Sequence, residues 1–278
     1  MYISLQPTLT ANRVPWPAFA DLASKLGFLG VDVIELRKAQ EAGVEETLAV
    51  LVRNRVKPAV MDLPVQFRND DAAFAESMKG LDDAAAFAAA IRCPRMTTWI
   101  MSSSETPKDD LWKTYRSRFQ QCSEVLGKHG VRLGLEFLGP LHIRKRFPHE
   151  FISTMPEMLT FAKECGANVG ILLDSWHWHH AGATAEDIVT AGKSRIIHVQ
   201  VADAPKLPPE QIRDNERLMP GEGILDWAAF FGALKRIGYV DAVSPEVFGR
   251  GLKDMPPEDG ARLGLRTTTD VMRRAGVL

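Results

Sequence analysis

Residues 131–138 read VRLGLEFL, and residues 169–174 read VGILLD. Two later runs have the same form, because residues 196–202 read IIHVQVA and residues 242–247 read AVSPEV. Each run is short, mainly apolar and rich in branched side chains, which is typical of strands buried on both faces of a parallel sheet. A helical pattern follows each run, so this half of the chain indicates repeated strand–helix units.

The amino-terminal half continues the same alternation of strands and helices. No linker or change of pattern interrupts it, and we expect one domain over residues 1–278. Eight strand–helix units in a chain of 278 residues predict an α/β fold of the closed (β/α)₈ TIM barrel type. The expected strands are Tyr2–Leu9, Val31–Leu36, Pro58–Val65, Met96–Met101, Arg132–Phe137, Val169–Asp174, Ile196–Ala202 and Ala242–Val247, and the expected early helices are Ala18–Leu26, Glu45–Asn54 and Asp71–Ile91.

Composition and charge exclude several classes of protein. Apolar residues make up 45% of the chain, which is enough for a large core and excludes disorder. A net charge of −1, from 34 basic and 35 acidic residues, argues against nucleic acid or an anionic membrane as a partner. No membrane span or signal peptide pattern is present, and the three scattered cysteines form no CxxC pair. We therefore expect a cytoplasmic protein.

Four of the expected strands end in a polar residue that a buried strand would not favour: Glu136, Asp174, Gln200 and Glu246. Taken singly, each side chain could cap a helix or pair with a nearby cation. Together they come from consecutive strands, and catalytic side chains of TIM barrels lie at the carboxyl ends of the strands. Three carboxylates and an amide are hard oxygen donors, so they predict one Mn²⁺ or Mg²⁺ ion per chain.

The same residues resemble the sugar isomerases and epimerases of the xylose isomerase-like TIM barrel superfamily. The resemblance implies that Glu136, Asp174, Gln200 and Glu246 hold one divalent metal, with Glu136 and Glu246 also acting as the acid–base pair. Asp174 and His177 match the D-x-x-H pattern of that family, in which the histidine helps to hold a substrate oxygen. RLMPGEGILDW at 217–227 is similar to its loop after strand seven, where the counterpart of Arg217 contacts substrate. Gln200 stands where the ketose 3-epimerases carry histidine.

Further candidates surround these residues. Trp176 could stack on a sugar ring or simply pack in the core. His177 is expected to contact substrate, whereas His179 and His180 are expected to be structural or to face solvent. His198 lies two residues before Gln200 and shares its face of the strand. It is therefore either a core residue or a group that orients a ligand.

A basic segment, LHIRKRF at 141–147, follows Glu136 closely. It could form a lid that gathers an anionic or oxidised substrate, or it could be solvated surface. His142 within it is a candidate for substrate binding, or for an additional acid or base. No convincing phosphate-binding loop follows the last strand, which slightly favours an unphosphorylated substrate.

The predicted chemistry is proton abstraction next to the carbonyl of a ketose or related polyhydroxy compound, through an enediolate stabilised by the cation and by Arg217. Return of the proton would make the protein an isomerase or epimerase. Expulsion of a leaving group would instead make it a lyase, of the inosose or dehydroshikimate dehydratase type or a 3-oxo-glycoside eliminase. A binding barrel without catalysis and association into a homo-oligomer stay open. A related endonuclease function is disfavoured by the charge balance and by the few histidines at strand ends.

Overall fold

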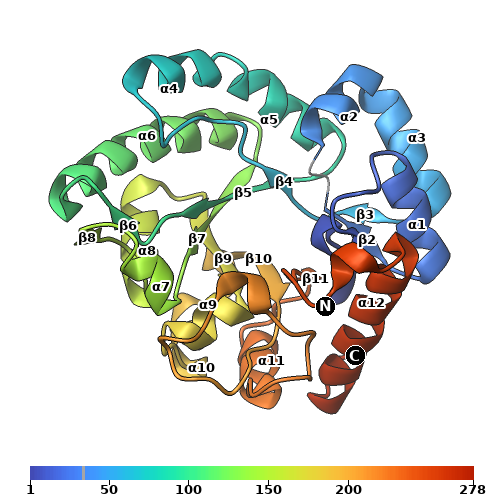
Figure 1. Cartoon of the computed structure of the whole chain (residues 1–278). Coiled ribbons are helices and arrows are strands. Elements are labelled where there is room, and N and C mark those ends of the chain that lie inside the picture. The colour runs from blue at the N-terminus through green and yellow to red at the C-terminus, as the bar shows by residue number, and fades with distance from the viewer. Residues whose placement is uncertain (33–34) are drawn as a thin grey trace.

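The computed structural model describes residues 1–32 and 35–278 and shows a curled parallel sheet surrounded by helices (Figure 1). Within the described residues, hydrogen bonds join nine short strands in the order β3-β2-β1-β11-β10-β9-β7-β5-β4. The strands are β1 (Tyr2–Leu5), β2 (Gly30–Val31), β3 (Lys57–Pro58), β4 (Met61–Asp62), β5 (Arg95–Ile100), β7 (Arg132–Phe137), β9 (Val169–Asp174), β10 (Ile196–Val201) and β11 (Ala242–Pro245).

The pairing order closes the sheet into a barrel. β3 pairs with β2, and β4 pairs with β5, so the two ends of the order are consecutive pieces of one chain segment, residues 57–62. Ala59 continues the pairing by donating its backbone N–H to Val31, and Leu63 donates to Thr97. This segment therefore acts as one bent strand between β2 and β5. The predicted TIM barrel is confirmed.

Helices cover the outside of the barrel, and two short ones lie at the carboxyl ends of strands. The outer helices are α1 (Ala18–Leu26), α2 (Leu36–Ala42), α3 (Val44–Asn54), α4 (Asp71–Met78), α5 (Leu81–Ala90), α6 (Lys108–Lys128), α8 (Met155–Cys165), α10 (Ala185–Ala191), α11 (Trp227–Arg236) and α12 (Pro257–Arg274). The short helices are α7 (Leu141–Arg144), which follows β7, and α9 (Ser175–His180), which follows β9 directly. Beside α7, β6 (Ser103–Ser104) pairs antiparallel with β8 (His149–Glu150).

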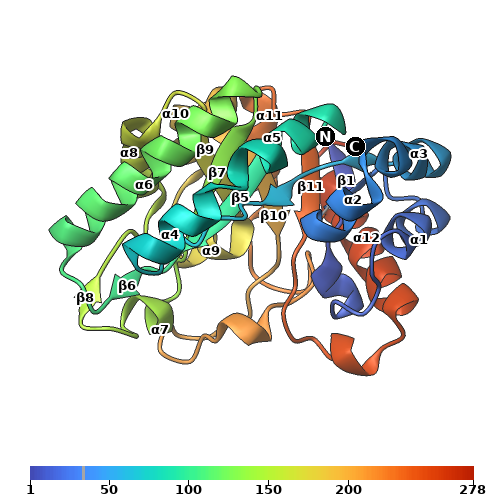
Figure 2. The same ribbon diagram turned by 90° about the horizontal axis from the view of Figure 1, so that it is seen from above.

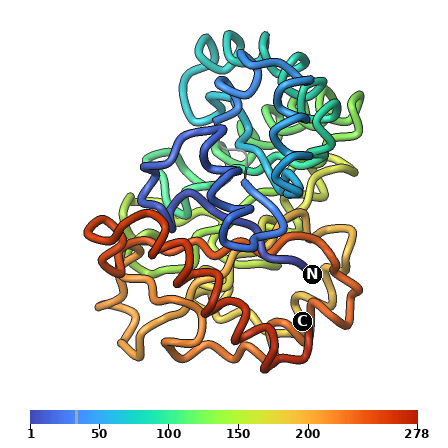
Figure 3. The backbone as a smooth tube through the Cα atoms, turned by 90° about the vertical axis from the view of Figure 1, so that its right-hand side faces the viewer, coloured from blue at the N-terminus to red at the C-terminus, as the bar shows by residue number. Residues whose placement is uncertain are grey.

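The two ends of the barrel differ in what they carry. Both chain termini lie side by side at the amino end, as Figures 2 and 3 show. In Figure 2 the longer loops, with α7 and the β6–β8 pair, extend from the opposite end. α12 packs against β1 and β11 and so joins the last segment of the chain to the first strand. Among the described residues, no helix is both long enough and apolar enough to cross a bilayer.

The strands of the carboxyl-terminal half lie where the sequence predicts them. β7 and β9 have the predicted bounds, whereas β10 and β11 end one and two residues earlier than expected. In the amino-terminal half, the strand predicted at 96–101 lies one residue earlier as β5, and the first three predicted strands are too long. β1 ends at Leu5, because the Gln6 side chain accepts the N–H of Thr8 and starts a 3₁₀ helix over Pro7–Thr10.

Three further predictions need correction. The strand expected at 31–36 ends its described pairing at Val31, Leu36 already belongs to α2, and residues 33–34 lie outside the described residues. The strand expected at 58–65 is paired only in two short pieces. The helix expected at 71–91 is two helices that break at Lys79 and Gly80, because glycine is a poor helix former.

Candidate metal and substrate site

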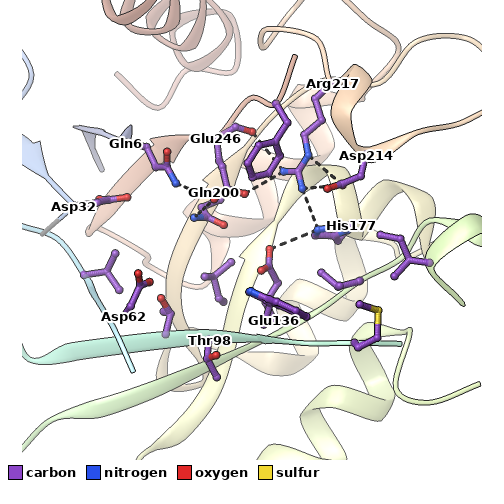
Figure 4. A pocket seen from close by; sticks show the side chains of 18 of the residues that line it. Gln6, Asp32, Asp62, Thr98, Glu136, His177, Gln200, Asp214, Arg217 and Glu246 are labelled. Atoms are coloured by element: carbon purple, nitrogen blue, oxygen red, sulfur yellow. Dashed lines mark hydrogen bonds and ion pairs between the residues drawn. The ribbon is translucent and has the colours of Figure 1, made fainter. Parts of the chain in front are cut away.

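A cavity of about 480 Å³ opens at the carboxyl ends of the strands, where catalytic side chains of TIM barrels lie. Figure 4 shows its polar side chains converging from several strands. Glu136 comes from β7, Gln200 from β10, and Glu246 directly follows β11. The polar lining comprises Gln6, Asp32, Asp62, Thr97, Thr98, Glu136, His142, Arg146, His177, Gln200, Asp214, Arg217 and Glu246.

Asp174 is placed by the junction of β9 with α9. It ends the strand, and its Oδ1 accepts the backbone N–H of Trp176 at 2.9 Å, which caps the helix. Its Cα pairs in register with that of Gln200 on β10, so the two residues lie at the same level on neighbouring strands, although Asp174 does not itself line the cavity. Asp174 is fully buried, and the cap leaves Oδ2 for other partners.

Glu246 is held by two amides. Gln6 donates from Nε2 to Glu246 Oε1 at 2.8 Å, and Gln200 donates from Nε2 to the same oxygen at 3.1 Å. These bonds leave Gln200 Oε1 buried and without a hydrogen-bond partner among the described residues, and Glu136 Oε1 is in the same condition. Buried oxygens without partners are costly. Two oxygens from predicted metal ligands are thus available for a cation.

Arg217 lies inside the carboxylate cluster. Its Nη1 is 2.7 Å from Asp174 Oδ2 and 3.2 Å from Glu246 Oε2, and its Nη2 is 2.9 Å from Asp214 Oδ1 (Figure 4). The side chain is only 2% exposed. The resemblance implies a substrate contact for Arg217. The structure does place it on the cavity wall, but also ties it to two of the predicted metal ligands.

Burial dominates the electrostatics of the cluster. It raises the pKa of Glu136 well above its usual value, and the charges of Glu246 and Asp174 raise that pKa further. Burial also raises the pKa of Asp174, and raises that of Glu246 to about 8 although Arg217 opposes it. Among the described residues, one guanidinium contacts this carboxylate cluster, which also includes Asp214. The cluster is therefore short of positive charge.

The donor set fits a divalent cation. Ligand atoms of Glu136, Asp174 and His177 lie within 4.8 Å of one another, and all three residues are buried. His177 Nδ1 lies 3.3 Å from the nitrogen of Gly139, and Nε2 faces the carboxylates and lies 3.2 Å from Arg217 Nη2. This group shares Glu136 and Asp174 with the predicted ligand set. The group of three includes His177, which was not a predicted ligand. The predicted ligand Glu246 is not part of the group, and its carboxylate contacts Gln6, Gln200 and Arg217.

The turn after β7 can approach α9 only because residue 139 is glycine. A Cβ atom at Gly139 would lie 2.4 Å from the carbonyl oxygen of His177 and 2.7 Å from the nitrogen of Ala181, closer than real Cβ atoms approach. The glycine thus sets the distance between the segment that follows Glu136 and the helix that carries His177.

Asp203 anchors the loop that carries Arg217. Asp203 was not identified as a functional residue by the sequence analysis. Its buried carboxylate accepts the backbone N–H groups of Gly221 and Leu225 and the indole N–H of Trp227, at 2.8–3.0 Å. It also accepts the N–H of Ala204. A Cβ atom at Gly223 would lie 2.5 Å from Asp203 Oδ1, so the PGEG turn needs glycine there.

The three clustered histidines all lie on α9, and the helix directs their side chains to different sides. His177 is turned to the cavity. His179 and His180 instead line a second cavity of about 410 Å³ outside the barrel mouth. Trp176 is fully buried and is not among the cavity-lining residues; Arg217 lies over its ring at 5.5 Å. The ring of Trp176 packs against the guanidinium of Arg217 and does not face the cavity. Of the two roles considered for Trp176, this placement supports packing in the core and not stacking on a sugar ring.

His198 lies in a polar layer beneath the cavity. Its Nε2 is 3.1 Å from Ser244 Oγ, and Ser244 and Ser4 both donate to Asp32 Oδ1, at 3.1 and 2.9 Å. All four side chains are buried. The sequence predicts that His198 shares a strand face with Gln200, and it leaves open whether His198 is a core residue or orients a ligand. The structure gives it a partner in the network that fixes Asp32.

The basic segment forms α7 at the rim of the cavity. His142 and Arg146 line the cavity, whereas Arg144 pairs with Glu150 at 2.7 Å. His142 Nδ1 is buried and without a partner among the described residues. Burial lowers the pKa of His142 below its ordinary value, which keeps the ring neutral near pH 7.

Sequence reasoning also missed Gln6, Asp32, Asp62 and Asp214 as lining residues. Asp32 and Asp62 could have been found by the rule that identified Glu136, because each follows an apolar run at the end of a strand. Asp214 lies in a 3₁₀ turn (Asp214–Glu216) three residues before Arg217. Nothing in its sequence context marks it.

Comparisons with known proteins agree with this architecture. The chain is 26% identical to an inosose isomerase of Halalkalibacterium halodurans over 88% of both chains. The match to the Bacillus subtilis inosose isomerase, at 27% identity, spans 63% of this chain and 61% of that protein. A shorter match, 28% identical, covers 52% of this chain but only 22% of a 3-dehydroshikimate dehydratase of Pseudomonas putida.

A solved structure and a family model cover nearly the whole chain. The structure of a xylose isomerase domain protein from Alicyclobacillus acidocaldarius is 28% identical and covers 99% of both chains, with a TM-score of 0.91. The model of the xylose isomerase-like TIM barrel family matches residues 20–271. The chain therefore belongs to the xylose isomerase-like TIM barrel family.

Proposed function

We propose that the protein is a divalent-metal-dependent isomerase or epimerase of a polyhydroxy ketone, such as an inosose or a ketose. The observation that carries the proposal is the placement of Glu136 and Glu246. They enter one cavity from β7 and from the end of β11, beside buried oxygens of Glu136 and Gln200 that have no partner among the described residues. The inosose isomerases matched over most of the chain support this substrate class.

The metal would be held by Glu136, Asp174, Gln200 and Glu246, with His177 close enough to replace one of them. When bound, a divalent cation orients adjacent oxygens of the substrate and polarises its carbonyl group. Oxygen donors favour Mn²⁺ or Mg²⁺, and participation of His177 would extend the set to metals that prefer nitrogen.

The side chains would divide the proton transfers between them. Glu136 would contact the metal through one carboxylate oxygen, and its other oxygen takes the proton from the carbon next to the carbonyl. Glu246 returns a proton to the same carbon from the other side or to its neighbour, which inverts the centre or moves the carbonyl. Arg217 stabilises the negative charge of the enediolate, because its guanidinium lies between Asp174 and Glu246 on the cavity wall.

A lyase is the second candidate, and the position of His142 favours it. Its ring lines the cavity with Nδ1 free among the described residues, and its lowered pKa leaves the ring neutral. A neutral imidazole could donate a hydrogen bond to a hydroxyl group on the carbon beyond the enediolate, and that group would leave as water with the proton that Glu136 took from the substrate. The partial match to a dehydratase is consistent with that chemistry.

Metal analysis of purified variants tests the proposal. Glu136→Gln and Glu246→Gln should lower bound Mn²⁺ and abolish turnover of a polyhydroxy ketone. Glu124→Gln removes an exposed carboxylate on α6 and should change neither property. If Glu246→Gln keeps full metal content and full turnover, the proposed site is wrong.

A further inference from the structure

A second group of acids faces the metal site across the cavity. Asp32 follows β2, Asp62 ends β4, and Thr98 lies on β5, the strand that pairs with β4 (Figure 4). The proton transfers proposed above use none of these three residues. Both carboxylates lie at the carboxyl ends of barrel strands, which is where the fold presents side chains to a substrate.

Asp32 is occupied by the protein itself. Ser4 and Ser244 donate to its Oδ1, and only 2% of the residue is exposed. These bonds fix Asp32 between β1 and β11, in the polar layer that includes His198. Its role is therefore to set the floor and the local charge of the cavity.

Asp62 is different, because its side chain lines the cavity and forms neither a hydrogen bond nor an ion pair with another described residue. Its side chain is open to the solvent of the cavity. The surrounding protein and then the charge of Asp32 raise the pKa of Asp62 to about 6. A carboxylate kept without a partner beside another carboxylate opposes folding. Such a group belongs to a ligand site more naturally than to a framework.

The chemistry of Asp62 selects among ligands. A carboxylate accepts hydrogen bonds from hydroxyl groups and repels other anions. Thr98 Oγ1 accepts from Arg68 at 3.3 Å and can direct its own hydrogen into the cavity. A substrate with its carbonyl group at Glu136 would extend its remaining hydroxyl groups toward this wall.

We propose that Asp62, beside Asp32 and Thr98, forms a subsite that accepts hydrogen bonds from substrate hydroxyl groups. The subsite selects uncharged polyhydroxy ketones against ligands that carry a carboxylate or phosphate group at that end. The inference rests on the proposed function for the position of the carbonyl group, and it specifies the substrate class of the same cavity.

Arg146 provides the opposing influence. It lines the same cavity, is exposed, and has no ion pair among the described residues. If Arg146 determined selectivity, an anionic ligand would bind more tightly than a neutral one. The two residues therefore predict opposite preferences, and binding measurements can distinguish them.

Calorimetric titration of the Mn²⁺-loaded protein tests the subsite without relying on turnover. The probes are an inosose, which is neutral, and 3-dehydroshikimate, which is a hydroxylated cyclic ketone with a carboxylate. We expect the wild-type protein to bind the inosose at least tenfold more tightly. Asp62→Asn keeps the size of the side chain and removes its charge, so it should weaken inosose binding and strengthen 3-dehydroshikimate binding, with the ratio of the two affinities falling about tenfold.

Glu124→Gln removes the same charge from the outer surface of α6 and should leave the ratio unchanged. Equal or tighter binding of 3-dehydroshikimate by the wild-type protein overturns the subsite, as does an unchanged ratio in Asp62→Asn or failure of both probes to bind.

The fate of the subsite can be separated from that of the proposed function. If Asp62→Asn changes the ratio but the wild-type protein catalyses no metal-dependent proton exchange, the subsite stands and the isomerase fails. If exchange occurs and the ratio is unchanged, the isomerase stands and the subsite fails.

Discussion

Arg217→Ala offers a stringent test of the charge balance in the site. Arg217 is 2% exposed and contacts the carboxylates of Asp174, Glu246 and Asp214 at 2.7–3.2 Å. Removing one member of a buried ion pair costs about 3–5 kcal/mol, because the remaining charges lose their partner. In a domain of this size each kcal/mol lowers the melting temperature by about 2–4 °C. Without metal, the variant should therefore melt roughly 6–20 °C below the wild type.

A bound divalent cation supplies positive charge to the same carboxylates, so it should restore part of this loss. A ligand at 100 times its Kd adds about 2.7 kcal/mol to the stability of the folded state. The variant should gain more than the wild type, because it has one positive charge fewer in the site. The difference in melting temperature should thus be smaller in Mn²⁺ than in EDTA.

Differential scanning calorimetry in EDTA and in Mn²⁺ measures both quantities. Arg236→Ala is the control, since Arg236 is 62% exposed and pairs with Glu186 at 3.5 Å, a surface contact worth about 0–1 kcal/mol. Equal melting temperatures of Arg217→Ala and wild type in EDTA would refute the reasoning. So would a temperature difference that is the same with and without Mn²⁺.

Three further predictions follow from other residues. Asp203→Asn should destabilise the protein by about 2–4 kcal/mol, because the amide NH₂ group cannot accept the hydrogen bonds that Gly221 and Trp227 donate. Urea unfolding measures this change, and an unchanged unfolding midpoint would contradict the anchoring role. Burial raises the pKa of Asp62 from its ordinary value of 3.8 to about 6, so the folded state binds the proton more tightly and stability falls as pH rises between these values. Asp62→Asn should therefore stabilise the protein at pH 7–8, by about 1 kcal/mol after allowance for solvent screening, and leave it unchanged below about pH 4; calorimetry at both pH values checks the sign. His142→Ala should abolish any elimination reaction but spare proton exchange, and loss of both in NMR assays would give His142 a role in the isomerase instead.

Sequence predicted the carboxyl-terminal half of the barrel more accurately than the amino-terminal half. β7 and β9 are six-residue apolar runs buried along almost their whole length, and such runs have well-defined ends. β3 and β4 pair over only two residues each, and the buried apolar residues Val60, Leu63 and Val65 lie outside the pairing. Apolar pattern therefore overestimated their length, because burial continues where the sheet ladder stops.

The site shows the same division between what strands determine and what loops determine. Strand periodicity was sufficient to bring Glu136, Gln200 and Glu246 to one cavity. It could not reveal that Arg217 would lie on the carboxylates, since that position depends on the loop held by Asp203. Likewise, Trp176 does not line the cavity, because Asp174 caps a helix that begins immediately after β9. The sequence of residues 175–180, SWHWHH, does not predict that helix.

Proton NMR in D₂O tests the central claim most directly. The Mn²⁺- or Mg²⁺-loaded protein is incubated with a panel of inososes and ketoses, and deuterium is sought at the carbon next to the carbonyl. We predict incorporation that requires the metal, leaves the carbon skeleton intact, and is lost in Glu136→Gln and Glu246→Gln. No incorporation from any member of the panel by the metal-loaded protein, or incorporation that survives both substitutions, would contradict the account.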